Sequence, residues 1–138
     1  MTYKPGAGFL VYRKFKDGIK FLGLKGPKKI RKLRNGIWDF PKGQKELGES
    51  DWDCAVREAF EECGIFVIKS DLVYGPLEIS KCAIFLIETS HNPTITRNPV
   101  SGIFEHEGFK WLNPSEMERD CYDWLRPFVQ WGRDFLKV

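Results

Sequence analysis

The segment from Ser50 to Gly64 constrains the fold most, because it contains the start and the end signals of a single helix. Ser50 is a favoured N-cap residue, and Asp51 and Asp53 follow in the first turn, where the helix dipole favours anions. Gly64 is the residue type expected just beyond the last turn. We therefore predict a helix from Asp51 to about Cys63.

This helix is expected to carry Glu58, Glu61 and Glu62 on one face, because the spacing i, i+3, i+4 brings side chains together within one turn. Like charges at this spacing destabilise an isolated helix by about 0.2–0.5 kcal/mol per pair. Hard divalent cations, which prefer oxygen ligands, would offset the repulsion. The three glutamates alone leave a solvated acidic surface as an alternative.

The remaining apolar runs and turn signals predict a sheet. Strands are expected over residues 7–12, 19–24, 37–40, 65–68, 72–79, 82–88 and 108–112. Lys16, Asp17 and Gly18 indicate a turn that joins the first two strands into a hairpin. Loops are expected over residues 26–36, 42–49 and 89–102, a short helix from residues 113–115, and a longer helix over 120–136. This order predicts an α/β fold, a sandwich with a mixed β-sheet between helices.

Length and composition indicate one globular unit. With 138 residues we expect one domain over residues 1–138, and with 42% hydrophobic residues we expect a packed core rather than disorder. The chain has no apolar run long enough to span a membrane and no apolar segment of the secretory type near Met1. We therefore expect a soluble, cytoplasmic protein with no membrane partner.

The four cysteines are expected to be reduced and structural. Cys54 and Cys63 fall in the same predicted helix, where their Cα atoms would lie about 13 Å apart, too far for a disulfide. Cys82 and Cys121 lie in other apolar runs, and no Cys-x-x-Cys or Cys/His cluster indicates zinc.

The charge of the chain is unevenly distributed. Residues 1–34 contain eleven Lys and Arg residues and one acid, a net charge of +10, so the chain total of +3 leaves −7 for the remainder. A basic front and an acidic remainder suit a polyanionic substrate held beside a cation-binding acidic cluster.

The residues around the glutamates form a longer pattern, in which Gly43 and Glu49 precede the run Arg57-Glu58-Ala59-x-Glu61-Glu62-x-Gly64-Ile65 at fixed intervals. This pattern resembles the Nudix box, and the chain is similar in motif to Nudix hydrolases over residues 38–65. The resemblance implies a Nudix α/β/α sandwich and a Mg²⁺-dependent hydrolase, with Mn²⁺ as a possible substitute, that cuts a pyrophosphate linkage attached to a nucleoside.

The resemblance also implies residue roles. The Gly43 carbonyl and the carboxylates of Glu58, Glu61 and Glu62 match the metal ligands of the family, and Glu58 serves as the base in some members. Arg57 and Glu49 match the pair that fixes the loop against the helix and orients the metal ligands without binding the metal. We count Arg57 with the glutamates among the candidate catalytic residues.

Two flanking segments indicate the substrate class. Residues 38–43, Trp-Asp-Phe-Pro-Lys-Gly, resemble the lead-in of dinucleoside-polyphosphate hydrolases and of messenger-RNA decapping enzymes, and residues 49–55 are closer to the decapping group. Residues 105–111 resemble a segment of asymmetric diadenosine-tetraphosphate hydrolases and bacterial RNA 5′-pyrophosphohydrolases. There a glutamate at the position of Glu105 supplies a further metal ligand or a base.

Several residues near the box are candidates for substrate binding. Trp38 and Phe40 could stack on a base, and Lys42 could contact a phosphate. The basic loop from Lys25 to Arg34 could clamp phosphates or form a solubilising surface. The candidate phosphate-binding residues in it are Lys28, Lys29, Arg31, Lys32 and Arg34. Phe109 could face a base or pack inward, and we assign no ligand role to His91 or His106.

The substrate stays open between a dinucleoside polyphosphate and a 5′-phosphorylated or capped RNA. A nucleotide-sugar or nucleoside-triphosphate pyrophosphatase has less support. A Nudix-fold module that binds a nucleotide without cutting it would be expected to lack one of the box carboxylates, and all are present here. The expected partner is a nucleotide or an RNA 5′ end, and no obligate protein partner is evident.

Overall fold

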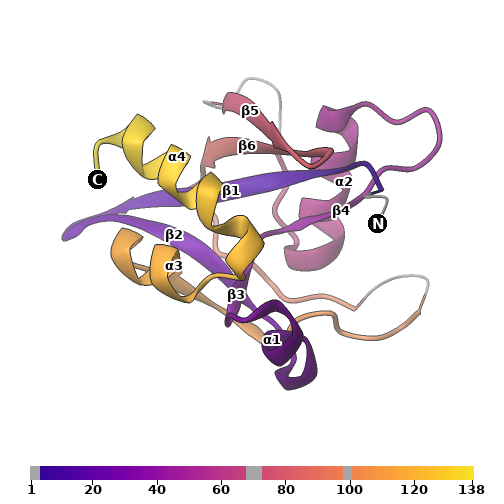
Figure 1. The fold of residues 1–138 in the computed structure, drawn as a ribbon, viewed down its shortest axis with the longest axis horizontal. Coiled ribbons are helices and arrows are strands. Elements are labelled where there is room, and N and C mark those ends of the chain that lie inside the picture. The colour runs from indigo at the N-terminus through magenta and orange to yellow at the C-terminus, as the bar shows by residue number, and fades with distance from the viewer. Residues whose placement is uncertain (1–3, 68–72, 98–100) are drawn as a thin grey trace.

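The computed structural model describes residues 4–67, 73–97 and 101–138, and within them a sheet lies between helices (Figure 1). The strands are β1 (Gly6–Phe15), β2 (Gly18–Lys25), β3 (Trp38–Asp39), β4 (Lys42–Gln44), β5 (Val73–Ile79), β6 (Cys82–Glu88) and β7 (Gly108–Leu112). The helices are α1 (Lys28–Arg34), α2 (Asp51–Cys63), α3 (Pro114–Asp120), the 3-10 turn η1 (Asp123–Leu125) and α4 (Arg126–Leu136). None of the helices in these described ranges is long and apolar enough to cross a membrane.

Strand β1 is the central strand of the sheet, whose main order is β3-β2-β1-β6-β5. It pairs with β6 in parallel, with Gly8 opposite Ile84, and with β2 in an antiparallel hairpin, with Tyr12 opposite Phe21. Strand β4 pairs with the beginning of β1, and β7 pairs with β2. The sheet is therefore mixed, as the sequence predicted.

The two faces of the sheet bury two separate cores, because successive side chains of a strand point to opposite faces. On β1, Phe9 and Val11 pack into the cluster formed with α2, whereas Leu10 and Tyr12 pack into the cluster that contains Phe128 of α4. Figure 1 shows α3 and α4 on one side of the sheet and α2 on the other. The predicted α/β/α sandwich is confirmed.

Helix α2 forms where its end signals predicted it. The Ser50 hydroxyl oxygen accepts a hydrogen bond of 3.0 Å from the backbone N–H of Asp53. Gly64 ends the helix with a φ of 66°, a left-handed conformation that glycine adopts without steric cost. The local signals thus place both ends of the helix that carries the three glutamates.

Residues 26–36, predicted to be a loop, contain helix α1. Pro27 precedes the first turn, where the N–H groups have no helical partner and the missing proline N–H costs nothing. Asn35 ends the helix with a φ of 51°, and its backbone N–H donates to the Arg31 carbonyl. The flanking Gly-Pro and Asn-Gly pairs are typical of turns, but here the proline and the asparagine mark the two ends of a helix whose residues are mostly good helix formers.

The single helix predicted over residues 120–136 is also wrong, because α3 ends at Asp120 and α4 begins at Arg126. Between them the chain pairs with the sheet: the Tyr122 N–H donates to the Trp38 carbonyl at 3.0 Å. Pro127 has no N–H and is tolerated only in the first turn of a helix, so it sets the start of α4. The proline was visible in the sequence, whereas the pairing with Trp38 was not.

Smaller differences occur near the box. Lys42–Gln44, predicted to be loop, forms β4, because Gly8 lets the two strands approach: a Cβ at Gly8 would lie 2.3 Å from the Lys42 Cβ. Residues 65–67 form no strand, although Ile65 and Val67 are buried, because their backbone has no strand partner among the described residues. Residues 68 and 72, the end and the start of two predicted strands, lie outside the described residues.

The four cysteines are free thiols in the interior. Burial raises the pKa of Cys63 to about 12 and that of Cys82 to about 11, which keeps both thiols protonated near neutral pH. Their environment is that of packing residues rather than of nucleophiles.

Candidate active site

The last two turns of α2 bring Glu58, Glu61 and Glu62 to one small pocket. The opposite wall comes from the chain before β7 and consists of Thr96, Glu105 and His106. The sequence predicted the three glutamates and Glu105 as one site, and the structure brings all four together. Figure 1 shows this part of α2 facing the long connection that leads to β7.

The carboxyl end of α2 is fixed by residues 94–96. The Thr94 N–H donates to the Cys63 carbonyl at 2.8 Å, and the Thr96 hydroxyl donates to the Glu61 carbonyl. These bonds satisfy carbonyl groups that a helix end otherwise leaves unpaired. They also place Thr96 on the wall of the pocket.

Gly43 lies in direct contact with Glu58. A Cβ at residue 43 would lie 2.2–2.4 Å from the three carboxyl atoms of Glu58, a distance that no side chain could occupy. The Gly43 carbonyl oxygen accepts a contact of 3.5 Å from the Cys54 thiol. The glycine therefore allows β4 to approach α2 closely at Glu58.

Arg57 organises the carboxylates around it. Its guanidinium binds both oxygens of Glu49, with Nε 2.7 Å from Oε2 and Nη2 3.0 Å from Oε1. Nη1 lies 2.8 Å from Glu58 Oε1 and 3.2 Å from Glu61 Oε2, and Nη2 donates to the Gln44 carbonyl at 2.9 Å. Hydrogen bonding to Arg57 lowers the pKa of Glu49 to about 2. The predicted pairing of Arg57 with Glu49 is present, and it ties the loop after β4 to the helix.

Glu62 is the most buried of the glutamates, with 7% of its surface exposed. Its Oε2 accepts a hydrogen bond of 2.6 Å from the Lys42 N–H. Burial, the nearby charge of Asp39 and a hydrogen bond with Glu105 raise the pKa of Glu62 well above its usual range. Burial likewise raises the pKa of Glu58. The pocket therefore holds more negative charge than its protein surroundings neutralise.

The donor set fits a hard divalent cation. Carboxylates and a backbone carbonyl are the oxygen ligands that Mg²⁺ and Mn²⁺ prefer, and a cation would offset the charge that raises the two glutamate pKa values. Among the described residues, no three His, Cys, Asp or Glu side chains already surround one point as metal ligands do. Arg57 Nη1 holds Glu58 and Glu61 instead, so their side chains would turn to bind a metal.

A second charged cluster lies buried beside the pocket and was missed from the sequence. Asp39 Oδ2 lies 3.0 Å from His106 Nε2, and Asp39 Oδ1 lies 3.1 Å from Lys42 Nζ. Burial alone would raise the pKa of Asp39, but Lys42 and His106 outweigh it and hold that pKa below its usual value. The sequence offered one signal of this cluster, the charged Asp39 inside the otherwise apolar run 37–40, because a buried carboxylate requires charged or polar partners.

Trp38 and Phe40 do not lie where a base could stack on them. Phe40 is fully buried and packs edge-on against Phe128, with ring centroids 6.5 Å apart, and Trp38 is 8% exposed. Both belong to the core beneath α3 and α4. The prediction that they bind the base is wrong, because the strand turns both rings inward. Lys42 is close to the pocket, and its ammonium group lies 5.1 Å from the centre of the Trp124 ring.

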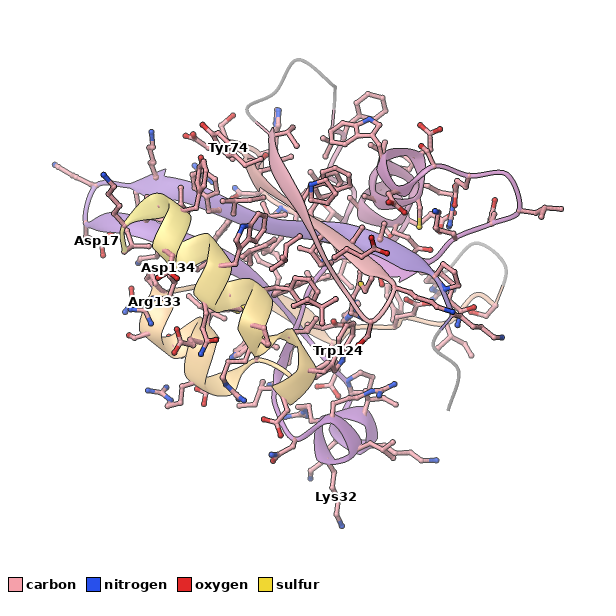
Figure 2. All side chains as sticks on the ribbon, turned by 45° about the horizontal axis from the view of Figure 1, so that its top comes forward. Asp17, Lys32, Tyr74, Trp124, Arg133 and Asp134 are labelled. Atoms are coloured by element: carbon pink, nitrogen blue, oxygen red, sulfur yellow. The ribbon has the colours of Figure 1, made fainter. Side chains whose placement is uncertain are left out.

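The basic residues of α1 lie on its outer surface. Arg31 is half-buried and lies 3.4 Å from Glu107, two residues beyond Glu105. The other four are exposed and form no ion pair with another described residue; they are Lys28, Lys29, Lys32 and Arg34. Figure 2 shows Lys32 pointing outward from α1, away from the sheet. Phe109 is 40% exposed, which leaves both of its predicted roles open, and His91 is exposed.

The sequence matches the family model of the NUDIX domain over residues 2–132. It is 30% identical over 113 residues to the asymmetrical bis(5′-nucleosyl)-tetraphosphatase of Caenorhabditis elegans, an alignment that covers 76% of this chain and 75% of that protein.

Solved structures share the fold. A binary complex of the Caenorhabditis elegans Ap4A hydrolase superposes with a TM-score of 0.72 at 21% identity and covers 98% of both chains. The NUDIX domain of Shewanella oneidensis NrtR, complexed with ADP ribose, has a TM-score of 0.66 at 13% identity and covers 99% of this chain and 90% of that one.

Proposed function

Because this chain belongs to the Nudix family and is a pyrophosphohydrolase, we propose that it hydrolyses the phosphate bridge of a dinucleoside polyphosphate in a Mg²⁺-dependent reaction. The observation that carries the proposal is the pocket in which Glu58, Glu61, Glu62 and Glu105 meet beside Gly43. The similarity to a bis(5′-nucleosyl)-tetraphosphatase supports the choice of substrate.

The Gly43 carbonyl, Glu58, Glu61 and Glu62 would hold the metal. A Mg²⁺ ion bound there would neutralise phosphate charge, polarise the phosphorus and lower the pKa of an attacking water. Glu105 would serve as a further ligand or, like Glu58, as the base that accepts the proton of that water. Mn²⁺, which prefers the same oxygen ligands, is the expected substitute.

The protein side chains orient this reaction. Glu49 fixes the guanidinium of Arg57, and Arg57 in turn keeps Glu58 and Glu61 close together, so that both carboxylates could turn to the metal from one side. Lys42, held by Asp39, offers a positive charge beside the pocket for a phosphate oxygen.

A second candidate substrate is the 5′ end of a phosphorylated or capped RNA, and α1 is the observation that favours it. The phosphate bridge of a dinucleotide is short, and the metal would occupy much of it. An RNA chain continues beyond the cut bond and could lie along the exposed cations of α1, which have no acidic partner among the described residues.

A substrate panel with Mg²⁺ separates these candidates. Diadenosine tetraphosphate, 5′-triphosphorylated RNA, capped RNA, a nucleotide sugar and a nucleoside triphosphate should be compared by kcat/KM under one set of conditions. We expect diadenosine tetraphosphate to be cut most efficiently. A higher kcat/KM for an RNA would show that the preferred substrate is an RNA 5′ end and not a dinucleoside polyphosphate. Nucleotide binding without hydrolysis of any substrate would indicate a non-hydrolysing binding module.

A further inference from the structure

The contact between Asp39 and His106 joins two parts of the chain that are 67 residues apart. Both side chains are buried, with 7% and 5% of their surfaces exposed, and the Asp39 Oδ2 to His106 Nε2 distance is 3.0 Å. Strand β3 supplies Asp39, and the connection before β7 supplies His106. Two polar groups that are so deeply buried need each other as partners.

The contact also belongs to a closed chain of interactions around the pocket. Asp39 Oδ1 lies 3.1 Å from Lys42 Nζ, and the backbone N–H of Lys42 donates to Glu62 at 2.6 Å. Glu62 lines the same pocket as Glu105, the neighbour of His106. Asp39 thus contacts both Lys42, which binds Glu62, and His106, which follows Glu105 in the chain.

The chain just before Glu105 is attached at Phe104, which forms an isolated bridge with Arg97, and other attachments follow Glu105. Residues 101–105 are exposed, and His106 is the buried residue in the stretch from 101 to 107. The Glu107 N–H donates to the Lys25 carbonyl at 2.8 Å, which fixes the backbone just after His106. His106 is also the side chain of this stretch that is both buried and part of the pocket lining.

We propose that Asp39 and His106 are positioning residues that hold Glu105 against Glu62 and so complete the metal-binding pocket. The inference rests on the proposed function, because it assigns a metal to these carboxylates. Neither residue is expected to touch the metal or the reacting atoms. Their effect passes through the placement of Glu105, and without their contact its carboxylate would be held less firmly beside Glu62.

The test compares three substitutions of His106 in the full chain. In His106→Gln, the amide nitrogen can take the place of Nε2 and still donate to Asp39. His106→Leu removes the hydrogen bond, and His106→Asn keeps a polar group that is too short to reach Asp39. The exposed histidine provides the matched control, His91→Gln. Each variant is made with and without Glu105→Gln.

Three quantities are measured: the Kd of Mn²⁺, from the electron paramagnetic resonance signal of the free ion, and kcat and KM for diadenosine tetraphosphate. We expect His106→Leu and His106→Asn to weaken Mn²⁺ binding about ten-fold or more and to lower kcat with little change in KM. His106→Gln should stay near the wild type. Once Glu105→Gln is present, the same His106 substitutions should add little, because two residues that act through one contact are not additive.

Several results would overturn the inference. One is unchanged Mn²⁺ binding in His106→Leu and His106→Asn, and another is a full additional loss in the Glu105→Gln background. If His106→Leu does not fold, His106→Asn and His106→Gln decide the matter, and equal behaviour of these two contradicts the proposal. Failure of the proposed function has a separate signature, since then the wild type and His91→Gln would neither bind Mn²⁺ nor hydrolyse the substrate, and both proposals would fall.

Discussion

Glu62 combines a nearly complete burial with a carboxyl group that receives one backbone hydrogen bond, from Lys42. Burial and the neighbouring acids raise its pKa, so the metal-free pocket favours a protonated carboxyl. A cation reverses this preference, because metal ligands bind in their deprotonated form. Packing alone gives no reason to place an acid in this position.

We predict that Glu61→Gln and Glu62→Gln each lower kcat about a hundred-fold or more, because an amide keeps the shape of the side chain and removes the charge that binds the metal. Steady-state kinetics with Mg²⁺ measures the loss, and circular dichroism checks that the fold is kept. Asp53→Asn removes an exposed acid of the same helix and should keep normal activity. Near-normal kcat in both glutamine variants would show that the metal site lies elsewhere.

Glu105→Gln should lower kcat while KM changes little, because in the proposed reaction Glu105 is a ligand or a base rather than a binding contact. The pH profile of kcat provides the measurement. Glu78→Gln, which changes an exposed acid of β5, is the control. A kcat equal to that of the wild type across the pH range would leave Glu105 as an ordinary surface acid.

Residues close together in the sequence were predictable, and those joined only by the fold were not. The fixed spacing of Gly43, Glu49 and Arg57 to the glutamates placed these residues in one site, and the structure has them in contact. Asp39 and His106 meet across 67 residues, and no local pattern indicates such a contact.

At the scale of elements, helix ends with local signals were predicted well. Ser50 and Gly64 bound α2 as expected. The sequence alone did not locate α1 or the break at residues 121–122, because α1 is short and flanked by turn-like Gly-Pro and Asn-Gly pairs, and the break depends on a hydrogen bond to β3. Trp38 and Phe40 were misplaced for a related reason, since a strand of two residues shows no alternation that would tell which face is buried.

Removing the helix cap should affect stability more than catalysis. Ser50→Ala deletes the oxygen that accepts from the Asp53 N–H and is expected to lower the free energy of unfolding by about 1 kcal/mol. Urea denaturation measures this loss. Ser115→Ala, in the first turn of α3 where no side-chain cap bond forms, should change stability by clearly less. Equal losses in the two variants would mean that the Ser50 bond contributes nothing.

Helix α1 predicts a salt effect that depends on the substrate. Each phosphate neutralised on a single strand contributes about −0.7 to the slope of log affinity against log salt. Changing its four exposed cations to Gln should therefore flatten the slope for RNA by roughly one to three units and leave cleavage of diadenosine tetraphosphate almost unchanged. The four are Lys28, Lys29, Lys32 and Arg34.

The control for this experiment removes the same charge elsewhere, in Lys14, Lys16, Lys81 and Lys137. Asp17, the sequence neighbour of Lys16 in the hairpin turn, lies on the opposite side of the molecule from Lys32 (Figure 2). Fluorescence titration at three salt concentrations gives both slopes. If the α1 variant and the control have equal slopes for RNA, α1 is a solubilising surface and the RNA candidate loses its main support.

For the whole molecule, the buried acids link stability to pH and to metal. The folded-state pKa of Glu62 is raised above the usual value of 4.5, so between that value and the raised pKa the folded state binds more protons than the unfolded state. Its contribution to stability is therefore lost as the pH rises through this window. Mg²⁺ binds the deprotonated carboxylates and should restore more stability at higher pH.

Thermal unfolding in EDTA and in Mg²⁺ across this pH range provides the measurement. The gap between the two Tm values should widen as the pH rises. In Glu62→Gln, the fall of the Tm with rising pH in EDTA and the rise of the Tm on adding Mg²⁺ should both be smaller than in the wild type. Identical profiles for the variant and the wild type would mean that Glu62 is not a metal ligand.

Metal-dependent hydrolysis of diadenosine tetraphosphate tests the account most directly. The protein is stripped with EDTA, Mg²⁺ is titrated back, and product release is followed for the wild type and for Glu62→Gln. We predict no activity in EDTA, saturable recovery with Mg²⁺ or Mn²⁺ in the wild type, and no comparable recovery in the variant. Full activity in EDTA, or equal recovery in both proteins, would contradict the assignment of the glutamate pocket as the metal-dependent active site.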